Sequence, residues 1–235
     1  MKLFDMDSPL MNGLNKIADL MWLNLLTIIC CLPIFTVGAA MTAMHYCALK
    51  LVRNEEGNLT AQYFKAFKNN FKQATAIWFI LLAIVGILVG DFIIMGSGNY
   101  AIGDLVKICI GAICVFVLLM AEFVFALQAR FSNTVFHTMK NAFAVGMMQF
   151  PRAILMTLLY AAPVVCILIS YNLVPIVLLY GISLPVYLSA KLYNKIFTKL
   201  EARVLEQNPQ ETTVDEASDE RIVHDELDGT LNKRG

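Results

Sequence analysis

The chain contains four long runs without a single charged side chain. No Asp, Glu, Lys or Arg occurs in residues 20–49, 73–90, 108–121 or 153–190. A helix needs about 20 consecutive apolar residues to cross the hydrocarbon core of a bilayer. In lipid, only a helix or a closed barrel satisfies its own backbone hydrogen bonds. The runs therefore predict an all-α fold, an integral membrane helical bundle.

The lengths of these runs predict about five transmembrane helices. As one helix, residues 153–190 would measure about 57 Å, far more than one crossing requires, so this run is expected to cross twice. Ser170-Tyr171-Asn172 is the expected turn, and Pro175 is expected to start the next helix. The second and third spans are expected at about 74–95 and 108–129.

The first run, 20–49, holds Pro33 near its middle. Pro33 predicts a kink, and Thr36 and Gly38 are expected to reseal the backbone around it. A broken helix at this point could instead line a substrate site. We favour one bent crossing with the N-terminus outside the cell. The alternative is a re-entrant pair that turns at Pro33 and leaves the N-terminus inside.

The basic residues gather on one side of the predicted bundle. Loops 50–72 and 130–152 and residues 191–203 hold twelve Lys and Arg, whereas the opposite side holds three. The positive-inside rule then places both loops and the C-terminus in the cytoplasm, for a multi-pass protein of the cell membrane. Residues 1–206 form the predicted transmembrane domain. Residues 207–235 hold eight acids and three bases and predict a disordered cytoplasmic tail.

Two cytoplasmic amphipathic helices are expected in the membrane interface. In residues 60–72, aromatic and basic side chains recur at helical spacing on different faces. A related pattern around Phe136–Phe143 predicts a tandem repeat of span, interfacial helix and span, at about 20–95 and 108–170. We favour a simple anchor over a docking surface. The aromatic face comprises Phe64, Phe67 and Phe71, and the basic face comprises Lys65, Lys68 and Lys72.

Polar residues inside predicted spans are the candidate functional residues, because they are costly in lipid. Glu122 leads, and it is expected to pair with His45 or Lys50 or, as a buried carboxylate, to relay protons. Asp19 is expected to cap the first helix, and Asn24 to hydrogen-bond across helices. Structural roles are favoured over functional ones for all of them.

Several classes of function are excluded or disfavoured. The formal net charge is zero, which does not suit a nucleic-acid binder. The signatures of phosphate-binding loops, dinucleotide sites, serine hydrolases and zinc proteases are absent from the sequence. We therefore expect no enzyme, no cofactor and no metal site. Gly86-x-x-x-Gly90 permits close helix packing, either within the molecule or in a homo-oligomer.

The sequence contains the motifs Asp19-Leu20-x-x-Leu23-Asn24-Leu25-Leu26, Leu32-Pro33-x-x-Thr36-x-Gly38-Ala39, Leu49-x-Leu51-Val52-Arg53-Asn54-Glu55-Glu56-Gly57, Phe64-Lys65-Ala66-Phe67-Lys68-x-Asn70-Phe71, Arg130-Phe131 and Lys140-Asn141-Ala142. Over about residues 7–200, these motifs resemble the YesL family of bacterial multi-pass membrane proteins. That family has no characterised function. Its members often lie beside genes for carbohydrate transporters and sugar-responsive two-component systems. The resemblance implies an accessory component of carbohydrate uptake or sugar sensing, with a membrane transporter or sensor as its partner. The alternative is a small transporter or channel with a polar site near Glu122.

Overall fold

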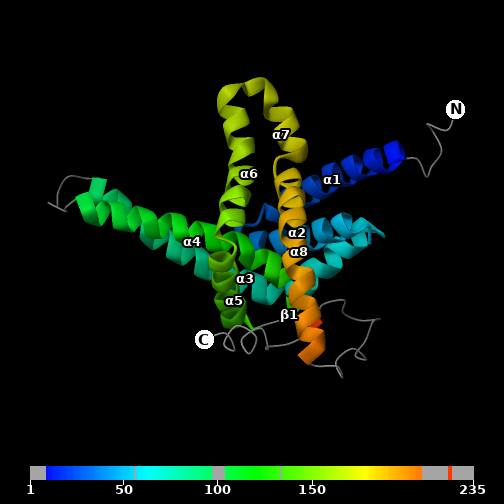
Figure 1. Cartoon of the computed structure of the whole chain (residues 1–235). Coiled ribbons are helices and arrows are strands. Elements are labelled where there is room, and N and C mark those ends of the chain that lie inside the picture. Colours follow the sequence, from blue (N-terminus) through cyan, green and yellow to red (C-terminus); the bar gives the residue numbers. More distant parts are fainter. Residues whose placement is uncertain (1–8, 56, 97–103, 133, 208–221, 224–235) are drawn as a thin grey trace.

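The computed structural model describes residues 9–55, 57–96, 104–132, 134–207 and 222–223 (Figure 1). This part of the chain is helical, as predicted, apart from a two-residue parallel pairing of β1 (Phe131–Ser132) with β2 (Ile222–Val223). The rest of the predicted tail lies outside the described residues. The helices are α1 (Pro9–Cys31), α2 (Val37–Arg53), α3 (Leu59–Gly96), α4 (Asp104–Arg130), α5 (Val135–Met148), α6 (Phe150–Ile169), α7 (Val174–Tyr180) and α8 (Ser183–Gln207), with 3-10 turns η1 (Ile34–Thr36) and η2 (Tyr171–Leu173).

The number of membrane-crossing candidates agrees with the prediction, but their identities differ in part. Within the described residues, five helices are long and apolar enough to cross a bilayer, namely α1, α2, α3, α4 and α6. A sixth candidate is formed by α7 and α8, which meet at a bend of 55°. The expected turn after Ser170 is present as η2, and Pro175 lies in the first turn of α7.

The run 20–49 forms a helical hairpin rather than one bent helix. The helix stops at Cys31, and the chain turns through η1 before α2 begins. The Lys16 Nζ donates to the Leu51 carbonyl oxygen at 3.1 Å and to the Asn54 side chain. The start of α1 therefore lies beside the end of α2, so the two helices run antiparallel. Whichever side of the membrane holds the end of α2 also holds Lys16, which contradicts our preferred single crossing. The orientation of the bundle itself stays a prediction.

The segment predicted as a separate interfacial helix is the beginning of α3, which continues without a break for 38 residues. No Gly or Pro separates residues 60–72 from the following span, so nothing in the sequence ends the helix there. Asn58 caps α3, because its Oδ1 accepts the Ala61 backbone N–H at 3.2 Å. Phe67 and Phe71 are half-buried and their rings lie together, whereas Phe64 and the three lysines are exposed. Much of the aromatic face therefore packs within the protein.

The second copy of the repeat does form a separate helix, α5. It ends at Met148, and α6 begins with Pro151 in its first turn. Proline lacks the N–H that a continuing helix would need, so the chain breaks between the two helices. The tandem repeat itself stays a prediction, because the first copy is fused to its following span and the second is not.

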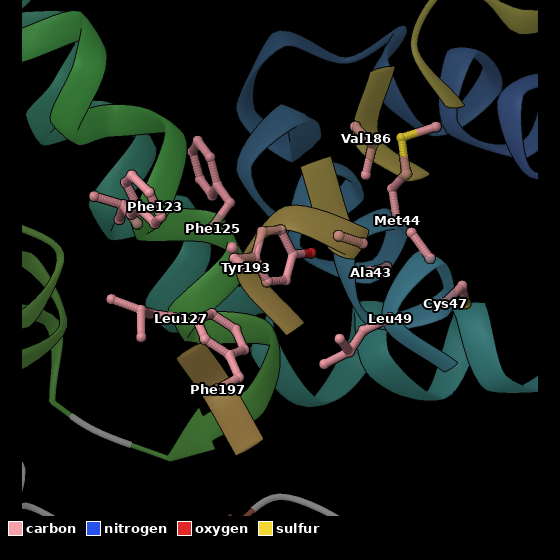
Figure 2. Packing of buried hydrophobic residues seen from close by; sticks show 14 of the residues in the cluster. Ala43, Met44, Cys47, Leu49, Phe123, Phe125, Leu127, Val186, Tyr193 and Phe197 are labelled. Carbon is pink, nitrogen blue, oxygen red and sulfur yellow. The ribbon is translucent and has the colours of Figure 1, made fainter. Parts of the chain in front are cut away.

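The centre of the molecule is α2, which packs against α1, α3, α4 and α8. Its side chains are small where neighbours approach closely, and Ala39, Ala40, Ala43 and Ala48 are fully buried. Figure 2 shows aromatic residues of α4 and α8 gathered beside this helix, namely Phe123 and Phe125 of α4 and Tyr193 and Phe197 of α8. Small residues let helix backbones approach, and aromatic rings fill the remaining volume.

Two arms extend from this core in different directions (Figure 1). One is formed by the second half of α3 and the first half of α4, and the other by α6 with α7. Large apolar side chains on both arms are exposed. Exposed apolar surface of this extent is expected of helices that face lipid or another membrane protein.

Candidate functional site

Glu122 lies on α4 where α6 crosses it. Its Oε1 accepts a hydrogen bond of 2.6 Å from the Thr157 hydroxyl on α6. Its Oε2 is buried and has no hydrogen-bond partner among the described residues. A carboxylate oxygen without a donor is strongly disfavoured in an apolar environment. This atom can therefore accept a proton, a water molecule or a cation.

The hydroxyl groups of Tyr160 and Ser189 extend this group of polar residues away from Glu122. Tyr160 is three residues beyond Thr157 on α6. Its hydroxyl lies beside Ser189 of α8 and is close enough to Glu122 to interact with the charge of that carboxylate. Within the described part of the chain, neither hydroxyl oxygen has a hydrogen-bond partner. Unpaired buried polar atoms are rare in proteins and often mark an ordered water molecule or a functional group.

The polar residues continue inward to α2. Tyr193 is four residues beyond Ser189 on α8 and is fully buried. Its hydroxyl lies near that of Tyr160. It is 3.1 Å from Nδ1 of His45, within hydrogen-bond distance. We call these residues of α2, α4, α6 and α8 the buried polar cluster. The cluster comprises His45, Glu122, Thr157, Tyr160, Ser189 and Tyr193.

The predicted pair of Glu122 with His45 or Lys50 is not present. Glu122 binds Thr157, and His45 binds Tyr193. The Lys50 ammonium lies over the Tyr46 ring, 5.2 Å from its centroid. The two candidate residues do belong to one cluster, but tyrosines separate them. Tyr160 reads as an apolar residue of a predicted span, and Tyr193 falls within the basic segment 191–203, so the pattern gave no reason to single them out.

Asn24 makes hydrogen bonds across helices, as predicted, and they close the break between α7 and α8. Its Nδ2 donates to the Leu178 carbonyl oxygen at 2.7 Å, and its Oδ1 accepts the backbone N–H groups of Ile182 and Ser183 at 3.0 and 2.9 Å. In a continuous helix the Ile182 N–H would donate to the Leu178 oxygen. The Asn24 amide is inserted between these two groups and satisfies both.

The three residues singled out around the first break have distinct positions. Pro33 precedes η1, and the Thr36 hydroxyl lies within hydrogen-bond distance of the carbonyl oxygens of Cys30 and Pro33. Thr36 thus reseals the turn in the predicted manner. Gly38 has a different role from the predicted one. It allows close contact between α2 and α3, because a Cβ at this position would overlap the Ala74 carbonyl oxygen.

Asp19 does not cap the first helix. That helix begins at Pro9, so Asp19 lies in its interior. The prediction failed because it took the start of the charge-free run for the start of the helix. The helix continues through the polar residues before the run, including Lys16, whose contacts with the end of α2 stabilise this extension.

The sequence did not lead us to predict an ion-pair cluster at the ends of α2 and α4. Glu201 of α8 accepts from Arg53 at 2.9 and 3.2 Å and from Arg130 at 2.7 Å. Arg53 also donates to Asn194 at 2.8 Å. The ends of α2 and α4 are thereby fixed to α8. One signal was available, because Glu201 is the first acidic residue after Glu122 in the chain.

A second missed group joins α3, α4 and α5. Gln128 is fully buried, and its amide nitrogen donates to Asn70 at 3.3 Å and to Gln73 at 2.8 Å. Its oxygen accepts from the Thr138 hydroxyl at 3.1 Å. This network uses both ends of the amide and so fixes the rotation of α4 against its two neighbours.

Comparison with known proteins gives a family match for one part of the chain. Residues 20–92 match the family described as "Protein of unknown function, DUF624". The matched region contains the second half of α1, all of α2 and most of α3, and therefore Asn24, Gly38 and His45. Glu122 and Glu201 lie outside it. No curated protein and no solved structure matches the chain.

Proposed function

We propose that this membrane protein is a non-enzymatic accessory component of carbohydrate uptake or sugar sensing. It would assemble with a membrane transporter or sensor through its exposed helices. The resemblance to YesL-family proteins, whose genes often adjoin those of carbohydrate transporters, supports this class of partner. The observation that carries the assembly role is the open face of α3.

This face contains the Gly86-x-x-x-Gly90 motif, and no described residue covers these glycines. A Cβ at either glycine would meet no atom of the described residues within 4 Å. The neighbouring Ile87 is 66% exposed. Glycines at this spacing let two helices approach closely in lipid, where dispersion forces and interhelical hydrogen bonds drive association. Since α4 packs elsewhere on α3, the motif is available to a helix of another protein.

Affinity isolation in mild detergent tests this assembly role. The tagged protein should retain a carbohydrate-transporter permease or a sugar sensor identifiable by mass spectrometry. Gly86→Ile with Gly90→Ile should lower its recovery about tenfold, because bulky side chains keep the partner helix away. Gly13→Ile is the matched control, since Gly13 of α1 also has open space around it.

Two results would contradict the proposal. One is equal recovery of the partner with the double variant. The other is recovery of the protein alone, or only of further copies of it, under conditions that keep known transporter complexes intact.

The buried polar cluster favours a second candidate, a small proton-coupled transporter. Glu122, Tyr160 and Ser189 each have a buried oxygen atom without a partner in the described structure. Acidic side chains inside membranes often relay protons. Purified protein in liposomes should then dissipate an imposed pH gradient, and Glu122→Gln should lower the rate to that of empty liposomes. Glu55→Gln, at an exposed position after α2, is the control. A wild-type rate equal to that of empty liposomes would remove this candidate.

A further inference from the structure

A basic pocket is lined by residues of α5 and α8 and of the chain where α6 begins. Its volume is about 340 Å³, which is enough for a phosphorylated headgroup. Among the described residues that line it, four are cationic and none is acidic. The cations are Arg152, Lys195, Lys199 and Arg203.

These four charges come together through two helices. Lys195, Lys199 and Arg203 are four residues apart on α8 and so share one face of it. Arg152 lies in the first turn of α6, where the helix dipole is also positive and no acidic residue offsets it. The Arg152 guanidinium donates to Gln149 at 2.5 Å. Within the described part of the chain, no carboxylate neutralises this group, so the pocket attracts an anion.

A second observation concerns Asn141 of α5, which also lines the pocket. It is only 2% exposed, and its Oδ1 is buried without a hydrogen-bond partner among the described residues. A buried amide oxygen without a donor is unfavourable. A ligand that carries hydroxyl groups beside its negative charge would satisfy this atom and the cations together.

The position of the pocket points to the membrane as the source of its ligand. Arg152 directly precedes the charge-free run 153–190, and Lys195 follows it after four residues. Met148 lines the pocket and is 55% exposed, and α6 continues from this point with exposed Ile154 and Leu158. A charged headgroup in the pocket would thus have its acyl chains beside an apolar helix face.

We propose that this pocket binds an anionic phospholipid with a hydroxyl-bearing headgroup. The phosphate contacts Arg152 and the α8 cations, and a headgroup hydroxyl donates to Asn141. Basic pockets between helices near the cytoplasmic surface are known to bind anionic headgroups. This inference does not rest on the proposed function, since it concerns a different surface.

The test uses the full chain in neutral detergent, with phosphatidylglycerol as the probe. Native mass spectrometry should show phosphatidylglycerol retained, and the unfolding temperature should rise with its concentration. Phosphatidylcholine at the same concentration should do neither. Lys195→Gln with Lys199→Gln should weaken binding of phosphatidylglycerol about 30-fold, because each cation near a membrane surface contributes about one kcal/mol. Lys65→Gln with Lys68→Gln removes two exposed charges from α3 and should leave binding unchanged.

Two further measurements test the proposal if the double variant fails to fold. Asn141→Leu changes no charge and should reduce the preference for phosphatidylglycerol over an anionic lipid without headgroup hydroxyls, such as phosphatidic acid methyl ester. Inorganic phosphate should not raise the unfolding temperature. Equal retention of phosphatidylcholine, unchanged binding by the α8 variant, an unchanged preference in Asn141→Leu or stabilisation by inorganic phosphate alone would each overturn the assignment.

Discussion

Replacing Gly38 with leucine should destabilise the protein by about 3 kcal/mol or more. A Cβ at this position would overlap the Ala74 carbonyl oxygen and lie 2.8 Å from the Cβ of Trp78. Both atoms belong to α3 or directly adjoin its backbone, so neither can move aside alone. Separating α2 from α3 would also open the core, because α2 lies at its centre. Thermal unfolding in detergent, followed by size-exclusion chromatography, measures the effect.

Gly13→Leu provides the matched control for this change. It introduces the same side chain into α1, where a Cβ meets no atom of the described residues within 4 Å. Helix propensity favours leucine over glycine at both positions, so the control isolates the steric contribution. An unfolding temperature of Gly38→Leu equal to that of the wild type would refute the close contact between α2 and α3.

Glu201→Gln is expected to lower the free energy of unfolding by about 3 kcal/mol. The substitution keeps the size of the side chain but leaves Arg53 and Arg130 without their shared carboxylate. The Glu201 side chain is only 11% exposed, so water compensates little of this loss. Chemical denaturation in detergent measures the difference, and Glu55→Gln at an exposed position is the control.

The effect of Glu201→Gln should depend on pH. Glu201 lies eleven residues beyond the last charge-free run. Burial alone would raise its pKa, but hydrogen bonds from Arg53 and Arg130 outweigh burial and hold the pKa below its ordinary value. A lowered pKa in the folded state contributes stability that is present above the unfolded-state pKa and is lost as pH falls through the folded-state value. The wild type and the variant should therefore differ fully at neutral pH and converge in acid. A difference that does not change with pH would show that the ion-pair cluster is not its source.

Predictions from local sequence succeeded where one physical requirement fixes the outcome. The runs without charge had to be helices, because lipid leaves few other ways to satisfy the backbone. Pro175 marks the start of α7, because a residue without a backbone N–H suits the first turn of a helix. In each case the signal and its cause lie within a few residues of each other.

The failures have their cause in contacts between distant residues. Pro33 is compatible with either a kink or a turn, and the contact of Lys16 with the end of α2 accompanies the turn. Similarly, Pro185 prevents a helical hydrogen bond to Gly181. The break in the last span also depends on Asn24, which lies on a helix far away in the sequence and accepts the Ile182 N–H. Single-sequence reasoning cannot see which helix lies next to which.

The candidate site was predicted in its parts and not as a whole. Glu122 and His45 were recognised because charge or an imidazole inside a span is conspicuous. Their connection through Tyr160 and Tyr193 depends on how α6 and α8 are rotated about their axes. The sequence specifies that rotation only through the combined packing of all neighbours.

The insertion of Asn24 into the last span has a mechanical consequence. Since the Leu178 oxygen and the Ile182 N–H both bind this one amide, the angle between α7 and α8 is set by a side chain that lies 154 residues before Leu178 and 158 residues before Ile182 in the chain. The orientation of α7 is thus coupled to the position of α1 through the Asn24 side chain. Any partner that displaces α1 along its axis would also change the angle between α7 and α8.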